Sequence, residues 1–196
     1  MSSMFETLAG QLLKGGQLQQ LSRHAGTTED QTRTAVSAAL PTLLGALARN
    51  ASQPGGAEAL FGALEKDHDG GILDNLTDFF QKPSTADGDG ILRHVLGDRR
   101  ETVEQGLGKG SGIDPKQMGS MLTMLAPLVM GYLGKQRREK NLDTAGLGDL
   151  LSGEKMSLEQ KMPEAGVLTK LLDKDGDGSV VDDIAGKLLG NLFGRG

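Results

Sequence analysis

An internal repeat, in which residues recur at an offset of 86 positions, constrains the fold of this chain more than any other feature. The two copies align without a gap, and in both an apolar residue recurs at positions i, i+3, i+7 and i+11, which is one face of an α-helix. The identical residues are Leu21, Gly26, Gln31, Pro41, Gly45 and Leu47 in the first copy and Leu107, Gly112, Gln117, Pro127, Gly131 and Leu133 in the second. The repeat predicts two equivalent helical units, at about 18–49 and 104–135.

Both copies carry the residues of a helix start, followed by a proline in the middle of the predicted helix. Thr28 and Gln31 fit a capping box, and Asp114, which precedes a proline, fits an N-cap. Pro41 and Pro127 each remove one backbone hydrogen bond and crowd the carbonyl four residues earlier. We therefore expect, in each copy, either a kinked helix or two helices broken at the proline.

The predicted fold class is all-α. Aromatic residues make up only 3% of the chain, which disfavours β-sandwiches and barrels, and the absence of cysteine excludes a disulfide scaffold and any cysteine-ligated zinc. Three regions are expected: a helical core at 1–136 that contains both repeats, a charged, glycine-interrupted linker with at most one short helix at 137–162, and a helix–loop–helix at 163–196. Shorter helices are predicted at about 4–13, 17–25, 56–66, 72–81, 91–106, 164–172 and 181–193.

An aspartate-rich loop near the C-terminus resembles the calcium loops of EF-hands and dockerins. Asp173, Asp175 and Asp177 occupy loop positions 1, 3 and 5, Gly178 occupies position 6, and Ser179 offers a carbonyl at position 7. Three carboxylates at this spacing can converge on one hard cation. The pattern therefore predicts Ca²⁺ binding rather than Zn²⁺ or Cu²⁺ binding.

The loop departs from the calcium pattern at its end. Position 12, which should be a bidentate acid, is Ile184, whereas Asp182 and Asp183 occupy positions 10 and 11. Either the loop is one residue short and Asp183 closes it, or the site is weak. The alternative is a solvated, aspartate-rich turn without a metal.

Two upstream segments are fainter relatives of this loop. Asp67, Asp69 and Asp74 lie in the first, and Asp87 and Asp89 lie in the second. Both could supply weaker metal ligands, but aspartate and glycine also form helix caps and turns, and this second interpretation is favoured.

Charge disfavours nucleic acid as a partner, because the net charge is −5 and is spread evenly along the chain. Residues 17–40 fit a helix-turn-helix, but the start of its second helix carries Glu29 and Asp30 against Arg33 alone. The basic cluster Lys135, Arg137, Arg138 and Lys140 is interpreted as part of a solvated linker. The start of the chain lacks a signal-peptide pattern and no segment is long enough to span a membrane, so we expect a cytoplasmic protein.

Three stretches together resemble the YidB-like bacterial proteins, a catalogued domain of unknown function. They are the Ala-Leu-Pro-Thr-Leu-Leu-Gly segment within 35–47, the Gly-Gly-Ile-Leu-Asp-Asn-Leu segment at 70–76, and 173–178. The resemblance implies an all-helical, homeodomain-like arrangement in a soluble bacterial protein. It implies no activity and no catalytic residues.

The expected function is that of a non-enzymatic, calcium-binding helical module that contacts a protein partner or a second copy of itself. The three histidines His24, His68 and His94 are not at metal-ligand spacing, and no catalytic constellation is recognisable. A DNA-binding regulator that uses the helix-turn-helix is the alternative. An enzyme with an unrecognised site is the lesser alternative.

Calcium should stabilise the chain if the C-terminal aspartates converge on it. A ligand that binds only the folded form adds about 2.7 kcal/mol at a hundredfold excess over Kd, which should raise the local melting temperature. Asp175→Ala should abolish this response, Asp183→Ala should weaken it, and Asp182→Ala should matter less. Calorimetry that shows no heat with millimolar Ca²⁺, together with unchanged melting, would remove the site.

Overall fold

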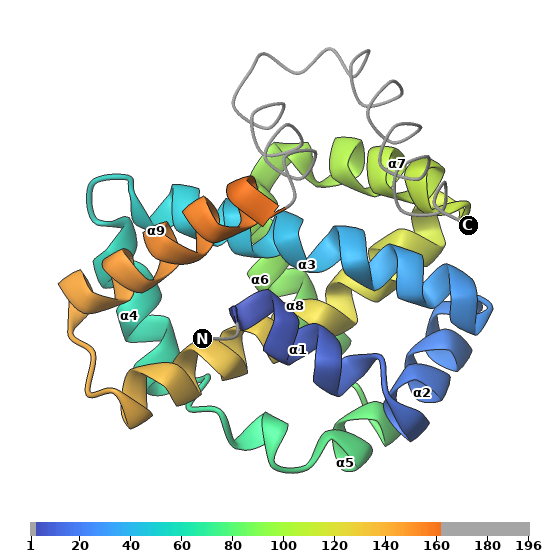
Figure 1. Ribbon diagram of the computed structural model, residues 1–196, viewed down its shortest axis with the longest axis horizontal. Helices are drawn as coiled ribbons and strands as arrows, with labels where there is room; N and C mark the ends of the chain where they lie inside the picture. Colours follow the sequence, from blue (N-terminus) through green and yellow to red (C-terminus); the bar gives the residue numbers. More distant parts are fainter. Residues whose placement is uncertain (1–2, 162–196) are drawn as a thin grey trace.

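The computed structural model describes residues 3–161, which form α-helices and two short 3₁₀ helices joined by short turns, without a strand (Figure 1). The all-α prediction is confirmed for this part of the chain. In chain order the elements are α1 (Met4–Leu12), α2 (Gly15–Ala25), α3 (Glu29–Ala51), α4 (Gly56–Lys66), η1 (Gly71–Leu73), α5 (Leu76–Gln81), α6 (Thr85–Leu96), η2 (Gly97–Arg99), α7 (Arg100–Ser111), α8 (Pro115–Glu139) and α9 (Thr144–Lys161). Within the described residues, no helix is long and apolar enough to cross a membrane.

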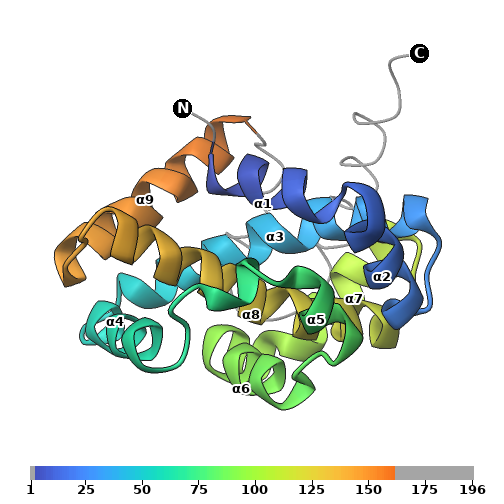
Figure 2. The same cartoon turned by 90° about the horizontal axis from the view of Figure 1, so that it is seen from below.

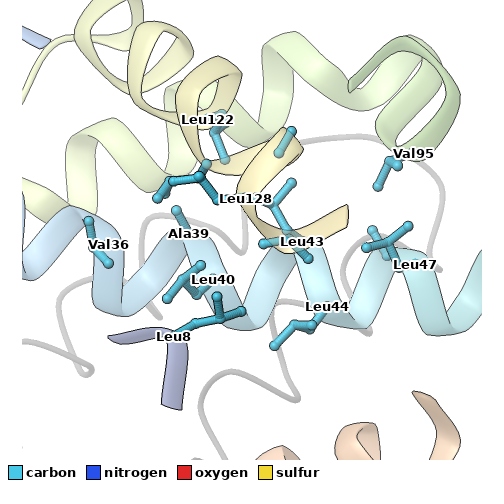
Figure 3. Packing of buried hydrophobic residues seen from close by; sticks show 14 of the residues in the cluster. Leu8, Val36, Ala39, Leu40, Leu43, Leu44, Leu47, Val95, Leu122 and Leu128 are labelled. Carbon is cyan, nitrogen blue, oxygen red and sulfur yellow. The ribbon is translucent and has the colours of Figure 1, made fainter. Parts of the chain in front are cut away.

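The long helices α3 and α8 form the centre of the molecule. Figure 2 shows α1 and α9 on one side of them and α4 and α6 on the other. Leu43 and Leu128 are buried in the core, where Figure 3 shows them close together, and Leu8 of α1 lies on the far side of α3. Burial of both central helices over most of their length supplies the main hydrophobic stabilisation of the fold.

The connections from α2 to α3 and from α7 to α8 are built in the same way. α2 and α7 each end at a glycine in the left-handed region, Gly26 with φ 67° and Gly112 with φ 68°. The predicted capping box then starts α3 at Thr28, and the predicted N-cap Asp114 starts α8, where it also forms a capping box with Gln117. These local features agree with two equivalent units, and duplication of the whole unit stays a prediction.

Two hydrogen bonds join these turns reciprocally. Gln31 Nε2 donates to the carbonyl oxygen of Gly112 at 2.9 Å, and Gln117 Nε2 donates to that of Gly26 at 2.5 Å. Each glutamine also accepts from the N-cap backbone of its own helix. One side chain in each half therefore caps its own helix and binds the helix end of the other half.

Both mid-helix prolines lie inside continuous helices, so the predicted alternative of a break at the proline is wrong. α3 runs through Pro41 and α8 through Pro127, and both prolines are buried. Because the residues on either side of each proline pack into the core, burial outweighs the loss of one backbone hydrogen bond.

Helix α9 occupies the region that was predicted to be a linker with at most one short helix, and that prediction is wrong for 137–161. Residues 137–139 continue α8, and Thr144–Lys161 form one helix. Its buried residues are Leu147, Leu151, Glu154 and Leu158. This stripe is hidden in the sequence because a buried glutamate interrupts it and glycines surround it. The predicted C-terminal helix–loop–helix lies outside the described residues.

Residues 87–90, the Asp-Gly part of the second upstream segment, lie in the first turns of α6, ahead of the helix start that was predicted at about 91. Gly88 lies against α8 so closely that a β-carbon at this position would be 2.0 Å from the carbonyl oxygen of Thr123. That carbonyl is the one that Pro127 leaves without its helical donor. Gly90, one half-turn away, has open space in place of a β-carbon.

These two glycines of one helix should respond oppositely to alanine. Gly88→Ala should destabilise the protein by about 1–3 kcal/mol because backbone has to move. Gly90→Ala should stabilise it by about 0.5–1 kcal/mol, as alanine favours helix over glycine. Urea denaturation measures both, and a Gly88→Ala protein as stable as the parent would contradict the close packing of α6 on α8.

Candidate functional site

The first upstream aspartate segment forms a turn that is held by ion pairs. Asp69 accepts from the amide of Gly71 at 2.9 Å through Oδ1, and its Oδ2 lies 3.7 Å from Nη1 of Arg138. Asp74 Oδ1 lies 3.8 Å from Nζ of Lys135. Since these carboxylates face cations at the end of α8, the structure does not gather Asp67, Asp69 and Asp74 around a metal.

The basic cluster at the end of α8 is therefore not a solvated linker, contrary to the prediction. In addition to the pairs above, Arg137 lies 3.6 Å from Glu65 of α4 and stacks over the ring of Phe61, with 4.9 Å from Cζ to the ring centroid. The helix dipole also favours cations at the C-terminal end of a helix. The cluster holds α4 and the turn that follows it against α8.

The second upstream segment places its two aspartates on different sides of α6. Asp87 accepts a 2.5 Å hydrogen bond from Oγ of Ser84, whereas Asp89 lies 2.7 Å from Nη2 of Arg100 and accepts from Oγ1 of Thr123 at 3.2 Å. Helical residues two apart do not face each other. Asp87 and Asp89 therefore do not form a joint metal site.

Within residues 3–161, no group of three or more histidine, aspartate or glutamate side chains is arranged to hold a metal ion. The stronger set of predicted calcium ligands lies outside the described residues: Asp173, Asp175, Asp177, Ser179, Asp182 and Asp183. Calcium binding there stays a prediction.

An apolar groove lies between the end of α3 and the helices α4 and α6, with a volume of about 880 Å³. Its apolar lining comes from all three helices and from Met130 of α8, and its polar lining includes two aspartates and two histidines. The lining residues used below are Leu60, Ala63, Asp67, His68, Asp87 and Ile91. Volume and lining are those of a typical ligand site, which makes this groove the candidate functional site.

Close contacts at the end of α3 fix the positions of α4 and α6, the two helices that form the walls of the groove. Asn50 of α3 donates through Nδ2 to the carbonyls of His94 and Val95 at 3.0 and 3.1 Å, which fixes the end of α6. A β-carbon on Gly56 would lie 1.9 Å from the carbonyl oxygen of Asn50, so the start of α4 packs directly on the same point. The two walls therefore share one anchor at the end of α3.

The opposite end of the groove rests on α8. A β-carbon on Gly134 would lie 1.7 Å from the carbonyl oxygen of His68, so the turn after α4 touches the backbone of α8. This contact brings His68 near Asp67 and Asp87. The spacing of residues in the sequence could not identify this group of side chains, because Asp67 lies at the end of α4 and Asp87 lies in α6.

The charge at this end of the groove is negative. Burial lowers the pKa of His68 from its ordinary value, and the negative charges of Asp67 and Asp87 oppose this shift only partly. His68 is therefore neutral at pH 7, and the carboxylates of Asp67 and Asp87 supply the charge. Among the described residues that line the groove, none is lysine or arginine.

The groove combines apolar contact with negative charge. Its described lining includes the carboxylates of Asp67 and Asp87 and contains no lysine or arginine that could bind an anionic ligand. It therefore offers apolar contact on the floor and attraction of positive charge at the end formed by Asp67 and Asp87.

Two polar side chains of the predicted helix-turn-helix, Arg33 and Gln31, are hydrogen-bonded within the protein. Arg33 donates through Nη1 to the carbonyl of Leu13 at 3.1 Å, and Gln31 binds Gly112. Glu29 and Asp30 are exposed at the start of α3. The first turn of α3 therefore presents negative charge to solvent, which does not favour phosphate contacts.

Protonation of His68 should cost folding stability. A histidine whose folded pKa is depressed contributes stability above its unfolded pKa of about 6.5, and this contribution is lost as the pH falls toward the folded pKa. The unfolding free energy of the parent minus that of His68→Asn should therefore be larger at pH 7.5 than at pH 5.5. Urea denaturation at the two pH values measures it, and a difference that grows on acidification would contradict the burial of the ring.

Neither the curated proteins nor the solved structures contain a match to this chain. A family model described as a bacterial protein of unknown function, DUF937, matches residues 6–136. The match spans the groove and both helix pairs and ends before α9 and before the aspartates from 173 onward. It confirms the resemblance to a catalogued bacterial family of unknown function, and the chain therefore belongs to the DUF937 family.

Proposed function

We propose that this protein is a non-enzymatic interaction module, and that its groove binds an amphipathic segment of a protein partner that carries positive charge. The observation that carries the proposal is the combination, in one groove, of an apolar floor with two carboxylates and no lining cation. An apolar ligand alone would leave the carboxylates unused, and an anionic ligand would be repelled.

The groove has a direction, because α4 and α6 cross it in opposite senses. The start of α4 and the end of α6 meet at Asn50, where the nearby polar groups are Gln53 and His94. The end of α4 and the start of α6 meet near Asp67 and Asp87. A bound segment would therefore place its apolar side chains on the floor and its basic residue at the carboxylate end.

The floor is accessible for such a segment. Leu60, Ala63 and Ile91 line it and are only partly buried, while Ala59 and Ala86 at its edges are exposed. Helix-in-groove recognition uses apolar anchors at positions i, i+3, i+4 and i+7, and a groove between two helices offers this spacing. The apolar contacts would supply most of the affinity, and the carboxylates would set the orientation.

Calcium uptake through residues 173–183 is a part of this proposal that rests on the sequence alone. The groove does not depend on it, so the two parts can be tested separately. No observation in the described residues favours DNA binding or catalysis as a second function.

A synthetic amphipathic helix of leucine and lysine should bind the groove, and its leucine–glutamate counterpart should not. The double substitution Asp67→Asn with Asp87→Asn should weaken binding about fivefold, since two exposed charge pairs contribute about 1 kcal/mol together. Ala86→Lys should weaken it as well, by placing a like charge at the edge. Fluorescence anisotropy of the labelled peptide measures these affinities.

Asp149→Asn is the matched control, because it removes one exposed negative charge on α9, away from the groove. It should leave the affinity almost unchanged, and added salt should weaken binding to the parent more than to the double variant. Equal binding of both peptides, or equal losses for Asp149→Asn and the groove variants, would overturn the proposal.

A further inference from the structure

Helix α9 lies outside the part of the chain that the family model matches. The family match ends at residue 136, and α9 starts at Thr144 after the end of α8. From there α9 runs across α4 and α3 (Figure 1), and its side chains Glu154 and Lys161 reach the first turn of α1. It thus covers a face that the matched domain itself provides through α1, α3 and α4.

A specific set of side chains docks α9 on this face. Leu147, Leu151 and Leu158 are buried at spacings of one turn or two. Between them, the carboxylate of Glu154 accepts from the amides of Met4 and Phe5 at 3.0 and 2.9 Å, and it is only 8% exposed. These amides are the free donors at the start of α1, where the helix dipole favours a negative charge.

The end of α9 adds one exposed pair. Lys161 donates from Nζ to Oε1 of Glu6 at 2.7 Å, and this hydrogen bond and charge lower the pKa of Glu6 from its ordinary value. Elsewhere α9 carries glycines at 146, 148 and 153, which weaken an isolated helix. The helix is therefore held by the face on which it docks.

The connection to α8 is short. Residues 140–143 separate the two helices, and Asn141 takes the left-handed conformation with φ 49° to reverse the chain. The conformation of this hinge, residues 140–143, determines whether α9 folds back on its own chain or extends away from it. An extended hinge would present the same four docking residues to the same face of a second molecule.

We propose that the face formed by α1, α3 and α4 accepts α9 of a second copy, so that two chains associate by exchanging α9. Every contact of Glu154 and of the three leucines is preserved in the exchange, because the occupant is the identical helix. The closed chain is favoured at low protein concentration, since the tether gives α9 a high effective concentration at its own face. The exchanged dimer is favoured as the concentration rises.

Two full-length hinge variants test this proposal. Deletion of Lys140 and Asn141 prevents the chain reversal and should tighten dimerisation about tenfold or more, whereas a flexible Gly-Ser insertion after Asn141 should keep the chain monomeric. Light scattering after size-exclusion chromatography measures both against the parent, across micromolar to millimolar concentrations. Equal association of all three proteins would overturn the exchange.

Glu154 distinguishes exchange from dimerisation through another surface. In the deletion variant, Glu154→Ala should break the dimer, and the amides of Met4 and Phe5 should be protected from hydrogen exchange only when Glu154 is present. A dimer that persists without Glu154 overturns the proposal. If the deletion variant fails to fold by circular dichroism, the comparison of the parent with the insertion variant at the highest concentration still decides, since equal association there has the same meaning.

Discussion

The packing of α6 on α8 is the contact on which the shape of the described chain depends. Pro127 leaves the carbonyl of Thr123 without its helical donor in a buried part of the molecule, and Gly88 covers that carbonyl. Arg100 then joins α6 to α7, because its guanidinium lies 2.7 Å from both Asp89 and Glu104. Burial of the guanidinium acts against its charged form, yet the two carboxylates outweigh this and raise the pKa of Arg100. Pro127, Gly88 and the ion pairs of Arg100 thus fix the position of α6, which forms one wall of the groove.

The groove itself results from backbone contacts that only glycine permits. Gly56 and Gly134 each leave space for a carbonyl oxygen where a β-carbon would overlap it. These two contacts set the ends of α4, and Gly88 sets α6, so the gap between the two helices is not free to close. The packing of α4 and α6 on α3 and α8 therefore keeps the apolar floor exposed to solvent, as a preformed binding site requires.

The caps and the fold class could be read from the sequence because each depends on residues close together in the chain. Thr28 with Gln31 forms the predicted capping box, Asp114 is the predicted N-cap, and α4 has the predicted bounds. Asp87 and Asp89 were misread as a loop, because the reason for a helix there, the contact of Gly88 with α8, joins residues far apart. α9 was missed because Glu154 looks solvent-exposed in the sequence, and its partners lie 149 and 150 residues away. The groove was missed for the same reason, since its carboxylates come from two helices.

Helix α4 connects the groove with the docking face of α9, because it forms part of both. Leu64 is its only fully buried residue among those described, and its N-cap, Gly55, makes no side-chain hydrogen bond. Close backbone contacts fix its two ends, and the contacts of Glu65 and Phe61 with Arg137 join it to α8. A ligand can bind the groove more tightly in one position of α4 than in another. Such a ligand changes the equilibrium constant for docking of α9 by at most the ratio of its affinities for the two positions, and docking of α9 changes the ligand's affinity by the same factor. Helix α9 and the groove are therefore thermodynamically linked through any change in the position of α4, although no residue of α9 lines the groove.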